Sequence, residues 1–214
     1  MTTTANGTEG APGEPMPEMA AAAAILRAFY PEETPMRLLL EKHSRQVAEM
    51  AAEILAGAPV PLRETIAPGD VVMAAMLHDI GIGRCHAPGI HCFGDCDYIA
   101  HGVLGGEMLR KYAAEHGADL EFCARVCERH TGSGLTRREI LDRRMPIAPP
   151  RDLLPETPLE KLICLADKFY SKSGAMERKP LEKVRRSMAK FGDAPLARFD
   201  ELMRFFRFSD GSGE

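Results

Sequence analysis

The chain has 214 residues, of which 45% are hydrophobic and 27% charged, as in a globular protein with one substantial core. A formal net charge of −4 gives no overall attraction to nucleic acid or to an anionic membrane, so neither is an expected partner. The opening residues carry no basic charge, and no apolar run is long enough to cross a bilayer. With six cysteines interpreted as reduced thiols, these features favour a cytoplasmic protein.

The first elements along the chain are a tail and two helices. A flexible tail is expected over 1–17, which is rich in Thr, Gly, Glu and Pro, and one folded domain over 18–214. A short helix fits 18–30. A stronger pattern begins at Thr34, a capping residue, and its apolar side chains recur at three- and four-residue steps as far as Gly57.

The rest of the chain continues the helical pattern. The stretch 81–97 holds five glycines or prolines and is expected to be a loop. Further helices are expected over 71–77, 98–116, 118–130, 136–144, 159–172, 181–191 and 196–206. Because no alternating apolar pattern of useful length and no repeat is present, the predicted fold class is all-α, a single-domain helical bundle.

Side chains that can bind metals lie on helix faces that otherwise point inward. They are His43, His78, Asp79, His101, His130 and Asp167. A buried polar group without a partner costs roughly 2–7 kcal/mol, and a charge costs more. Any one histidine could be a core residue bonded to a carbonyl, but a divalent cation would satisfy all six groups. Imidazole and carboxylate suit Fe, Mn, Co, Ni or Zn, with Mg possible, so the pattern predicts a site for one or two ions.

The order of four of these residues resembles the HD superfamily of metal-dependent phosphohydrolases, in its small HDIG form. His43 comes first, and the pair His78 and Asp79 then closes an apolar helix and runs into Ile-Gly. Asp167 follows far downstream. The resemblance spans about residues 36–172. It implies an HD-type bundle in which these four side chains bind one metal ion.

Two further histidines resemble the second ligand set of HD members that bind two metals, such as bacterial diadenosine-tetraphosphate hydrolases and HD-GYP cyclic-dinucleotide phosphodiesterases. His101 lies in Ala-His-Gly and His130 in Glu-Arg-His-Thr-Gly. The resemblance implies that Asp79 bridges two ions and that these histidines hold the second. The stretch 159–168 is similar to the diadenosine-tetraphosphate hydrolases. Thr131 begins a sequence unlike Gly-Tyr-Pro, so cleavage of cyclic dinucleotides is not expected.

The expected reaction is hydrolysis of a phosphate ester or phosphoanhydride, of a nucleotide, through metal-activated water. His78 and Asp79 are the expected catalytic ligands, and Arg84 and Lys168 are expected to neutralise phosphoryl charge. Four side chains near the motifs are candidates for contacting the substrate: Arg84, Lys168, Arg129 and His86. Each of them could instead be a solvated surface group.

Other interpretations follow from the same residues. A module that uses the metal to sense a nucleotide without turnover is the main alternative, although the intact ligand set favours an enzyme. The loop 84–97 contains cysteines and histidines, but not in the paired spacing of a zinc finger, so a structural zinc site there is less favoured. Its histidines either line the substrate mouth or face solvent. The phenylalanines of 199–208 either close the core or meet a second subunit in a homo-oligomer.

Overall fold

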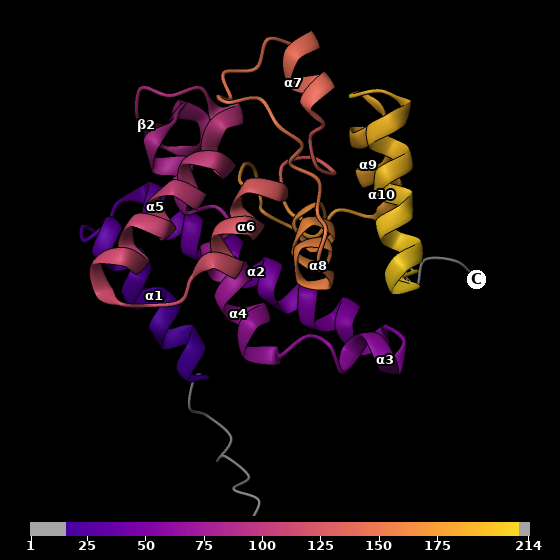
Figure 1. The fold of residues 1–214 in the computed structure, drawn as a ribbon, viewed down its shortest axis with the longest axis horizontal. Coiled ribbons are helices and arrows are strands. Elements are labelled where there is room, and N and C mark those ends of the chain that lie inside the picture. Colours follow the sequence, from indigo (N-terminus) through magenta and orange to yellow (C-terminus); the bar gives the residue numbers. More distant parts are fainter. Residues whose placement is uncertain (1–15, 210–214) are drawn as a thin grey trace, which may run out of the picture.

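The computed structural model describes residues 16–209, so the tail predicted over 1–17 lies almost wholly outside the described residues. Within them the chain is an all-α bundle, as predicted (Figure 1). The longer helices are α1 (Pro17–Phe29), α2 (Pro35–Gly57), α4 (Pro68–Leu77), α5 (His101–His116), α6 (Glu121–Arg129), α8 (Pro158–Asp167), α9 (Leu181–Ala189) and α10 (Asp193–Phe206). Two short helices, α3 (Val60–Arg63) and α7 (Arg137–Asp142), lie in connections. No helix in this range is long and apolar enough to span a membrane.

Helix α4 is the central element, since it contacts α1, α2, α6 and α8. Pro68 occupies its first turn, where a missing N–H does no harm, and Asp70 complements the positive end of the helix. Val71 is buried, and so is every residue from Ala74 to Leu77. A helix covered on nearly every side needs no polar face. Its C-terminus therefore delivers the next two residues into the middle of the protein.

Helices α2 and α8 pack against each other beside α4. The Thr34 side chain caps α2 by accepting a hydrogen bond from the backbone of Arg37 at 3.2 Å, as the sequence predicts. At α8, Thr157 and Glu160 form a reciprocal capping box. Helix α8 ends at Asp167 rather than continuing to 172. The backbone N–H groups of residues 168–170 donate hydrogen bonds to carbonyl oxygens three residues earlier, and this tighter turn ends the helix.

The loop predicted over 81–97 contains more regular structure than its glycines and prolines indicate. It holds a two-stranded antiparallel hairpin, β1 (His86–Ala87) and β2 (Cys92–Phe93), with the 3-10 segments η1 (Ile80–Arg84) and η2 (Pro88–Ile90). A third 3-10 turn, η3 (Tyr98–Ala100), follows the loop directly and leads into α5. All six cysteines are free, in agreement with the reduced thiols expected. Within residues 16–209, no cysteine belongs to a group of side chains that could hold a metal ion, so the structure lends no support to a zinc site in this loop.

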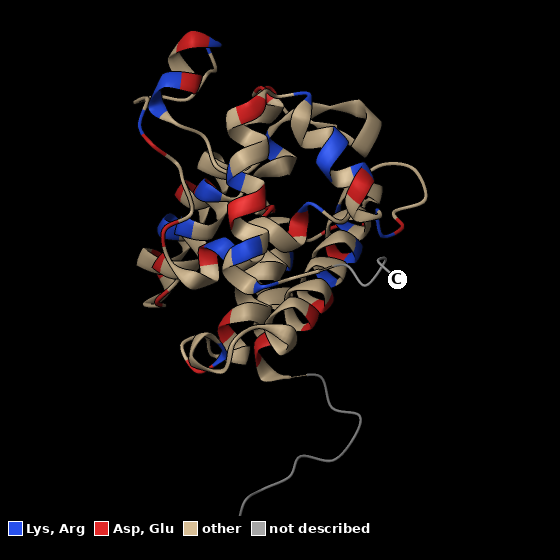
Figure 2. Ribbon diagram, turned by 90° about the vertical axis from the view of Figure 1, so that its right-hand side faces the viewer, with Lys and Arg blue, Asp and Glu red and all other residues tan. Residues whose placement is uncertain are grey.

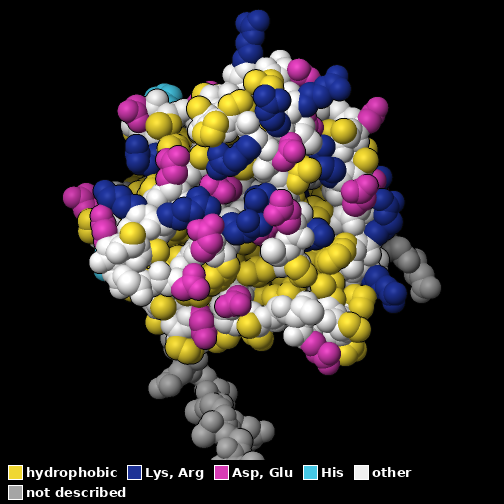
Figure 3. All heavy atoms as spheres, in the orientation of Figure 1, with side chains coloured by type: hydrophobic (Ala, Val, Ile, Leu, Met, Phe, Trp, Pro, Cys, Tyr) yellow, Lys and Arg dark blue, Asp and Glu magenta, His cyan; other side chains and the backbone are white. Residues whose placement is uncertain are grey.

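Two buried glutamates tie α6 to its neighbours. Glu128 of α6 receives hydrogen bonds from Arg110 of α5 at 2.7 Å and from Arg151 at 2.8 Å. Glu160 of α8 receives one from Arg125 of α6 at 2.7 Å. Elsewhere, positive and negative residues are intermixed along the ribbon in Figure 2 and on the face of the molecule drawn in Figure 3. The contacts of these two buried glutamates fix α6 between α5 and α8.

Helix α10 contacts α8 and α9 at one side of the bundle. Phe199 and Phe206 are fully buried there, so these phenylalanines close the core, while Phe205 is 38% exposed. Phe208 packs against the same core.

The turn η1 and helix α5 approach each other so closely that only glycine fits at Gly81. A Cβ atom there would lie 2.1 Å from the carbonyl oxygen of His101 and 2.5 Å from the nitrogen of Gly105. Both neighbours are backbone atoms and cannot rotate away. The absence of a side chain at Gly81 therefore sets the separation between the end of α4 and the start of α5.

We predict that Gly81→Ala lowers the free energy of unfolding by about 1–3 kcal/mol, as overpacking does in a filled core. The measurement is urea denaturation followed by circular dichroism. Gly57→Ala is the matched control, because nothing lies within 4 Å of a Cβ atom at that helical position. It should leave stability unchanged or slightly raised. Equal effects of the two substitutions would contradict the close approach at Gly81.

Candidate metal centre

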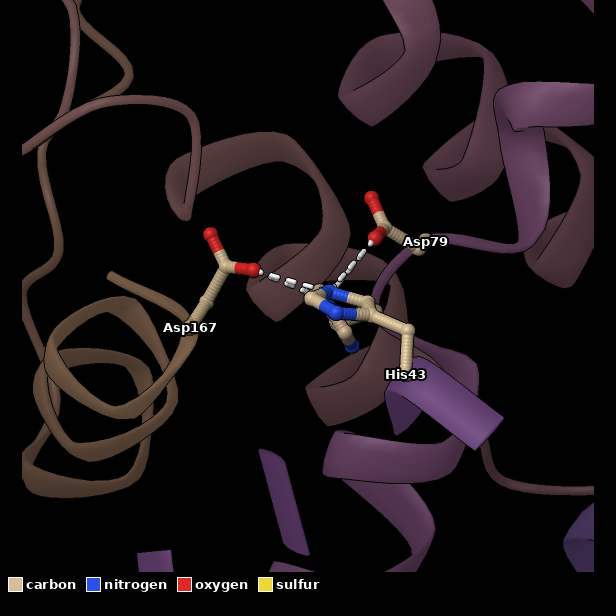
Figure 4. A group of neighbouring side chains, drawn as sticks. His43, Asp79 and Asp167 are labelled. Carbon is tan, nitrogen blue, oxygen red and sulfur yellow. Dashed lines mark hydrogen bonds and ion pairs between the residues drawn. The ribbon is translucent and has the colours of Figure 1, made fainter. Parts of the chain in front are cut away.

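Four buried side chains from three helices converge at one point. His43 comes from the middle of α2, His78 and Asp79 follow the end of α4, and Asp167 is the last residue of α8. His43 Nε2 lies 3.0 Å from Asp167 Oδ1 and 3.2 Å from Asp79 Oδ2 (Figure 4). His78 Nε2 lies 3.1 Å from Asp79 Oδ2 and 3.5 Å from Asp167 Oδ1. This is the first ligand group, which the sequence predicts.

A second group shares one residue with the first. His101 begins α5 and His130 follows the end of α6. Their Nε2 atoms lie 3.4 and 3.3 Å from Asp79 Oδ1, the carboxylate oxygen that the first group does not use. Asp79 therefore presents one oxygen to each group. This is the arrangement required of the bridging residue that the family resemblance implies.

The orientation of three imidazoles is fixed by backbone hydrogen bonds. The Nδ1 atoms of His78, His101 and His130 lie 2.6 to 2.8 Å from carbonyl oxygens three residues earlier in the chain. A carbonyl oxygen only accepts, so each Nδ1 carries a proton and each Nε2 faces the cluster, where it offers a lone pair to a cation whenever it is deprotonated. Backbone carbonyls bonded to the outer nitrogen are typical of histidines that bind metals.

Most of the inward-facing atoms lack a well-formed hydrogen bond. His101 Nε2 and His130 Nε2 are only 3.1 Å apart, and two lone pairs at that separation repel each other. Within the described residues, neither oxygen of Asp79 accepts a hydrogen bond of good geometry, and His78 Nε2 also has none. Because unsatisfied buried polar atoms are rare, a cation is the simplest group that would satisfy all of them. The cluster fits a divalent metal site.

Both carboxylates are held in the ionised form. Burial opposes ionisation of Asp79, but the charges of His78 and Lys172 outweigh it and keep the pKa well below the usual range. Burial likewise opposes ionisation of Asp167, and Lys168 and Lys172 lower its pKa in the same way. Ionised carboxylates are the form that binds cations.

The histidines differ in how readily they take up a proton. Burial lowers the pKa of His101 to about 3 and also lowers that of His130, so both are neutral at physiological pH. Burial disfavours the charged form of His78 too, but the carboxylates of Asp79 and Asp167 raise its pKa to about 9. The first ligand group therefore favours a positive charge at its centre.

A cavity of about 490 Å³ opens beside Asp167. It is lined by residues of the turn 87–90, by Tyr98, by the chain that follows α8 as far as Ser173, and by Lys179. A volume in this range accommodates a small-molecule ligand. The cavity gives the first ligand group an opening to solvent.

Of the four predicted substrate contacts, Lys168 lies at this cavity. Its Nζ donates to the carbonyl oxygen of His130 at 3.0 Å and to Asp167 Oδ2 at 2.6 Å, so it orients a ligand carboxylate. The structure does not bring the other three there. Arg84 and His86 are exposed, and neither is among the residues that line the cavity. Arg129 donates instead to the carbonyl oxygen of Leu154 at 2.9 Å, beside the buried Glu160 network.

Two cavity residues escaped sequence reasoning. Lys172 Nζ lies 2.5 Å from Asp79 Oδ2. The helical pattern of the sequence places Lys172 inside a helix over 159–172, whereas the helix ends at Asp167. Lys179 belongs to a run of basic residues that looks like the solvated face of the last helices, yet it lines the cavity. No spacing rule indicates either position.

Comparison with known proteins is consistent with this geometry. Residues 40–171 match the HD domain family. A stretch of 97 residues is 39% identical to the uncharacterized protein MJ0778 of Methanocaldococcus jannaschii, covering 45% of this chain and 46% of that protein. A stretch of 111 residues is 31% identical to a tRNA (cytidine(56)-2'-O)-methyltransferase of Picrophilus torridus, covering 52% of this chain and 27% of that enzyme.

The matched stretches thus span about half of the first relative and about a quarter of the second. No solved structure matches the chain significantly. The family match covers more than half of the chain and includes every residue of both ligand groups. The chain therefore belongs to the HD domain family.

Proposed function

We propose that this protein hydrolyses a phosphate ester or phosphoanhydride of a nucleotide. The observation that carries the proposal is the convergence of two buried ligand groups that share Asp79, with Asp167 of the first group in the wall of a cavity lined by lysines. Metal ligands alone would also suit a structural ion. A ligand group that opens onto a cavity of ligand size is typical of a catalytic site.

The proposed roles follow from the contacts. His43, His78, Asp79 and Asp167 would hold one divalent cation, and Asp79 with His101 and His130 a second. When bound, such a cation supplies Lewis acidity to a phosphoryl oxygen and lowers the pKa of water. The chemistry of these ligands suits Fe, Mn, Co, Ni or Zn, with Mg also possible.

The chain itself positions these groups. Lys168 holds Asp167 Oδ2, which leaves Oδ1 facing the histidines. Lys172 places an ammonium beside Asp79, where it would stabilise negative charge on a phosphoryl group. A nucleotide is supported by the cavity volume and by the aromatic rings of Tyr98 and Tyr170 in its wall.

The proposal predicts phosphate release from at least one member of a nucleotide panel that includes diadenosine tetraphosphate. Each substrate is tested with added Mn, Co, Fe or Mg, and released phosphate is measured. Removal of metal with a chelator should abolish release, and re-addition should restore it. Nucleotide binding without release under every metal would support the alternative, a sensing module without turnover.

Asp79→Ala should remove bound metal and reduce hydrolysis by at least about a thousandfold, because a catalytic metal contributes several kcal/mol to transition-state stabilisation. Metal content by mass spectrometry and kcat measure the two effects. Asp95→Ala is the control, since Asp95 is exposed on the nearby loop and belongs to neither ligand group. Activity that persists in metal-free Asp79→Ala protein would refute the proposed mechanism.

The double substitution His101→Ala with His130→Ala should reduce metal content from two ions per chain to one, because the first ligand group stays intact. The bound ion per folded chain is measured by the same mass spectrometry, with circular dichroism to confirm folding. A wild-type protein that already holds a single ion, unaffected by the double substitution, would contradict the second site.

A further inference from the structure

The wall of the cavity carries positive charge that the ligand groups do not account for. Lys168, Lys172 and Lys179 all line it, together with the hydroxyl side chains of Ser171 and Ser173. Lys168 is committed to a carbonyl and to a ligand carboxylate. Of the other two lysines, Lys172 lies beside a ligand carboxylate and Lys179 does not.

The segment that carries these two lysines is held against the bundle at two points. Gln46, which lies on the same helix as His43, donates from Nε2 to the carbonyl oxygen of Met176 at 2.6 Å. The backbone nitrogen of Lys179 donates to the carbonyl oxygen of Phe169 at 2.7 Å. The chain therefore leaves α8, turns, and returns beside its own starting point. Lys179 comes back to the cavity through these bonds.

Lys172 lies at the metal end of the cavity. Its Nζ is 2.5 Å from Asp79 Oδ2 and 3.9 Å from Asp167 Oδ1, and its side chain is only 12% exposed. Any phosphoryl group bound to a cation on Asp79 would lie close to this ammonium. Lys172 thus belongs with the first phosphate of a substrate.

Lys179 lines the same cavity but has no carboxylate of its own. Within residues 16–209, its ammonium forms no ion pair with a carboxylate and donates no side-chain hydrogen bond to one. Burial, together with the neighbouring charges of Lys168, Lys172 and Lys183, lowers its pKa to about 8, although the charge of Asp167 opposes this shift. A half-buried ammonium among other ammonium groups is unfavourable unless an anion joins them. An anionic group of a bound ligand would supply the missing counter-ion.

We infer that the cavity binds its substrate through two phosphates, the first at the metal centre beside Lys172 and the second at Lys179 with Ser171 and Ser173. This inference rests on the proposed function and narrows its substrate class. It favours a phosphoanhydride, such as a nucleoside diphosphate or triphosphate, over a nucleoside monophosphate or another simple phosphate ester.

The test uses two probes that cannot be hydrolysed, methylphosphonate with one phosphonate group and methylenediphosphonate with two. Their binding to the metal-loaded full-length protein is measured by isothermal titration calorimetry, and metal content is checked after each titration. Wild-type protein should bind methylenediphosphonate about tenfold to a hundredfold more tightly, as one charge-assisted contact implies. Lys179→Gln should remove this preference and leave the affinity for methylphosphonate unchanged.

Lys190→Gln is the matched control, because Lys190 is exposed at the end of α9 and does not line the cavity. It should retain the full preference. A preference that survives Lys179→Gln, or no preference in the wild-type protein, would overturn the two-phosphate site. Because neither probe is turned over, an inactive protein that keeps the preference would count against the hydrolytic function alone.

Discussion

The structure is organised around one fully buried carboxylate, that of Asp79. Four imidazoles and one ammonium lie within 3.4 Å of its two oxygens, and both oxygens are shielded from water. An ionised carboxylate without compensation in such a place would be prohibitively unfavourable. The surroundings keep it ionised nonetheless, because the positive charges around it outweigh the effect of burial on its pKa. Charge compensation at this point therefore decides which helices meet there.

The helices meet there because of specific packing features. Helix α4 is buried on nearly every side, so its C-terminus can carry Asp79 to the centre of the bundle. Gly81 then lets the backbone pass close to the carbonyl of His101, which brings the start of α5 to the carboxylate. At α6, a Cβ atom on Gly102 would lie 2.4 Å from the carbonyl oxygen of Cys127, so α5 and α6 also approach closely. Small residues at helix contacts are what allow the second ligand group to form.

The ligand groups could be predicted from the sequence because their residues break an otherwise apolar pattern. His43 lies on the buried stripe of a long helix with a clear cap, and Asp167 does the same at the end of α8. The cavity could not be predicted in this way. It depends on where α8 ends and on the bond from Gln46 to the segment beyond it, and tertiary contacts set both. Arg129 shows the converse error. It is held by the carbonyl oxygen of Leu154, in the connection before α8, and by Glu160 in the first turn of α8, and the path of that connection has no periodic pattern.

Local charge at the cavity differs from the charge of the whole chain. The chain carries a formal net charge of −4, which argues against any general affinity for polyanions. At the first ligand group, however, the charge of the two carboxylates would be cancelled by one divalent cation, and the lysines of the cavity wall would remain uncompensated. Interactions between partly buried charges are screened by salt much less than those at the surface. A small ligand with several negative charges would therefore be attracted into the cavity, whereas charges of the two signs are mixed on the face drawn in Figure 3.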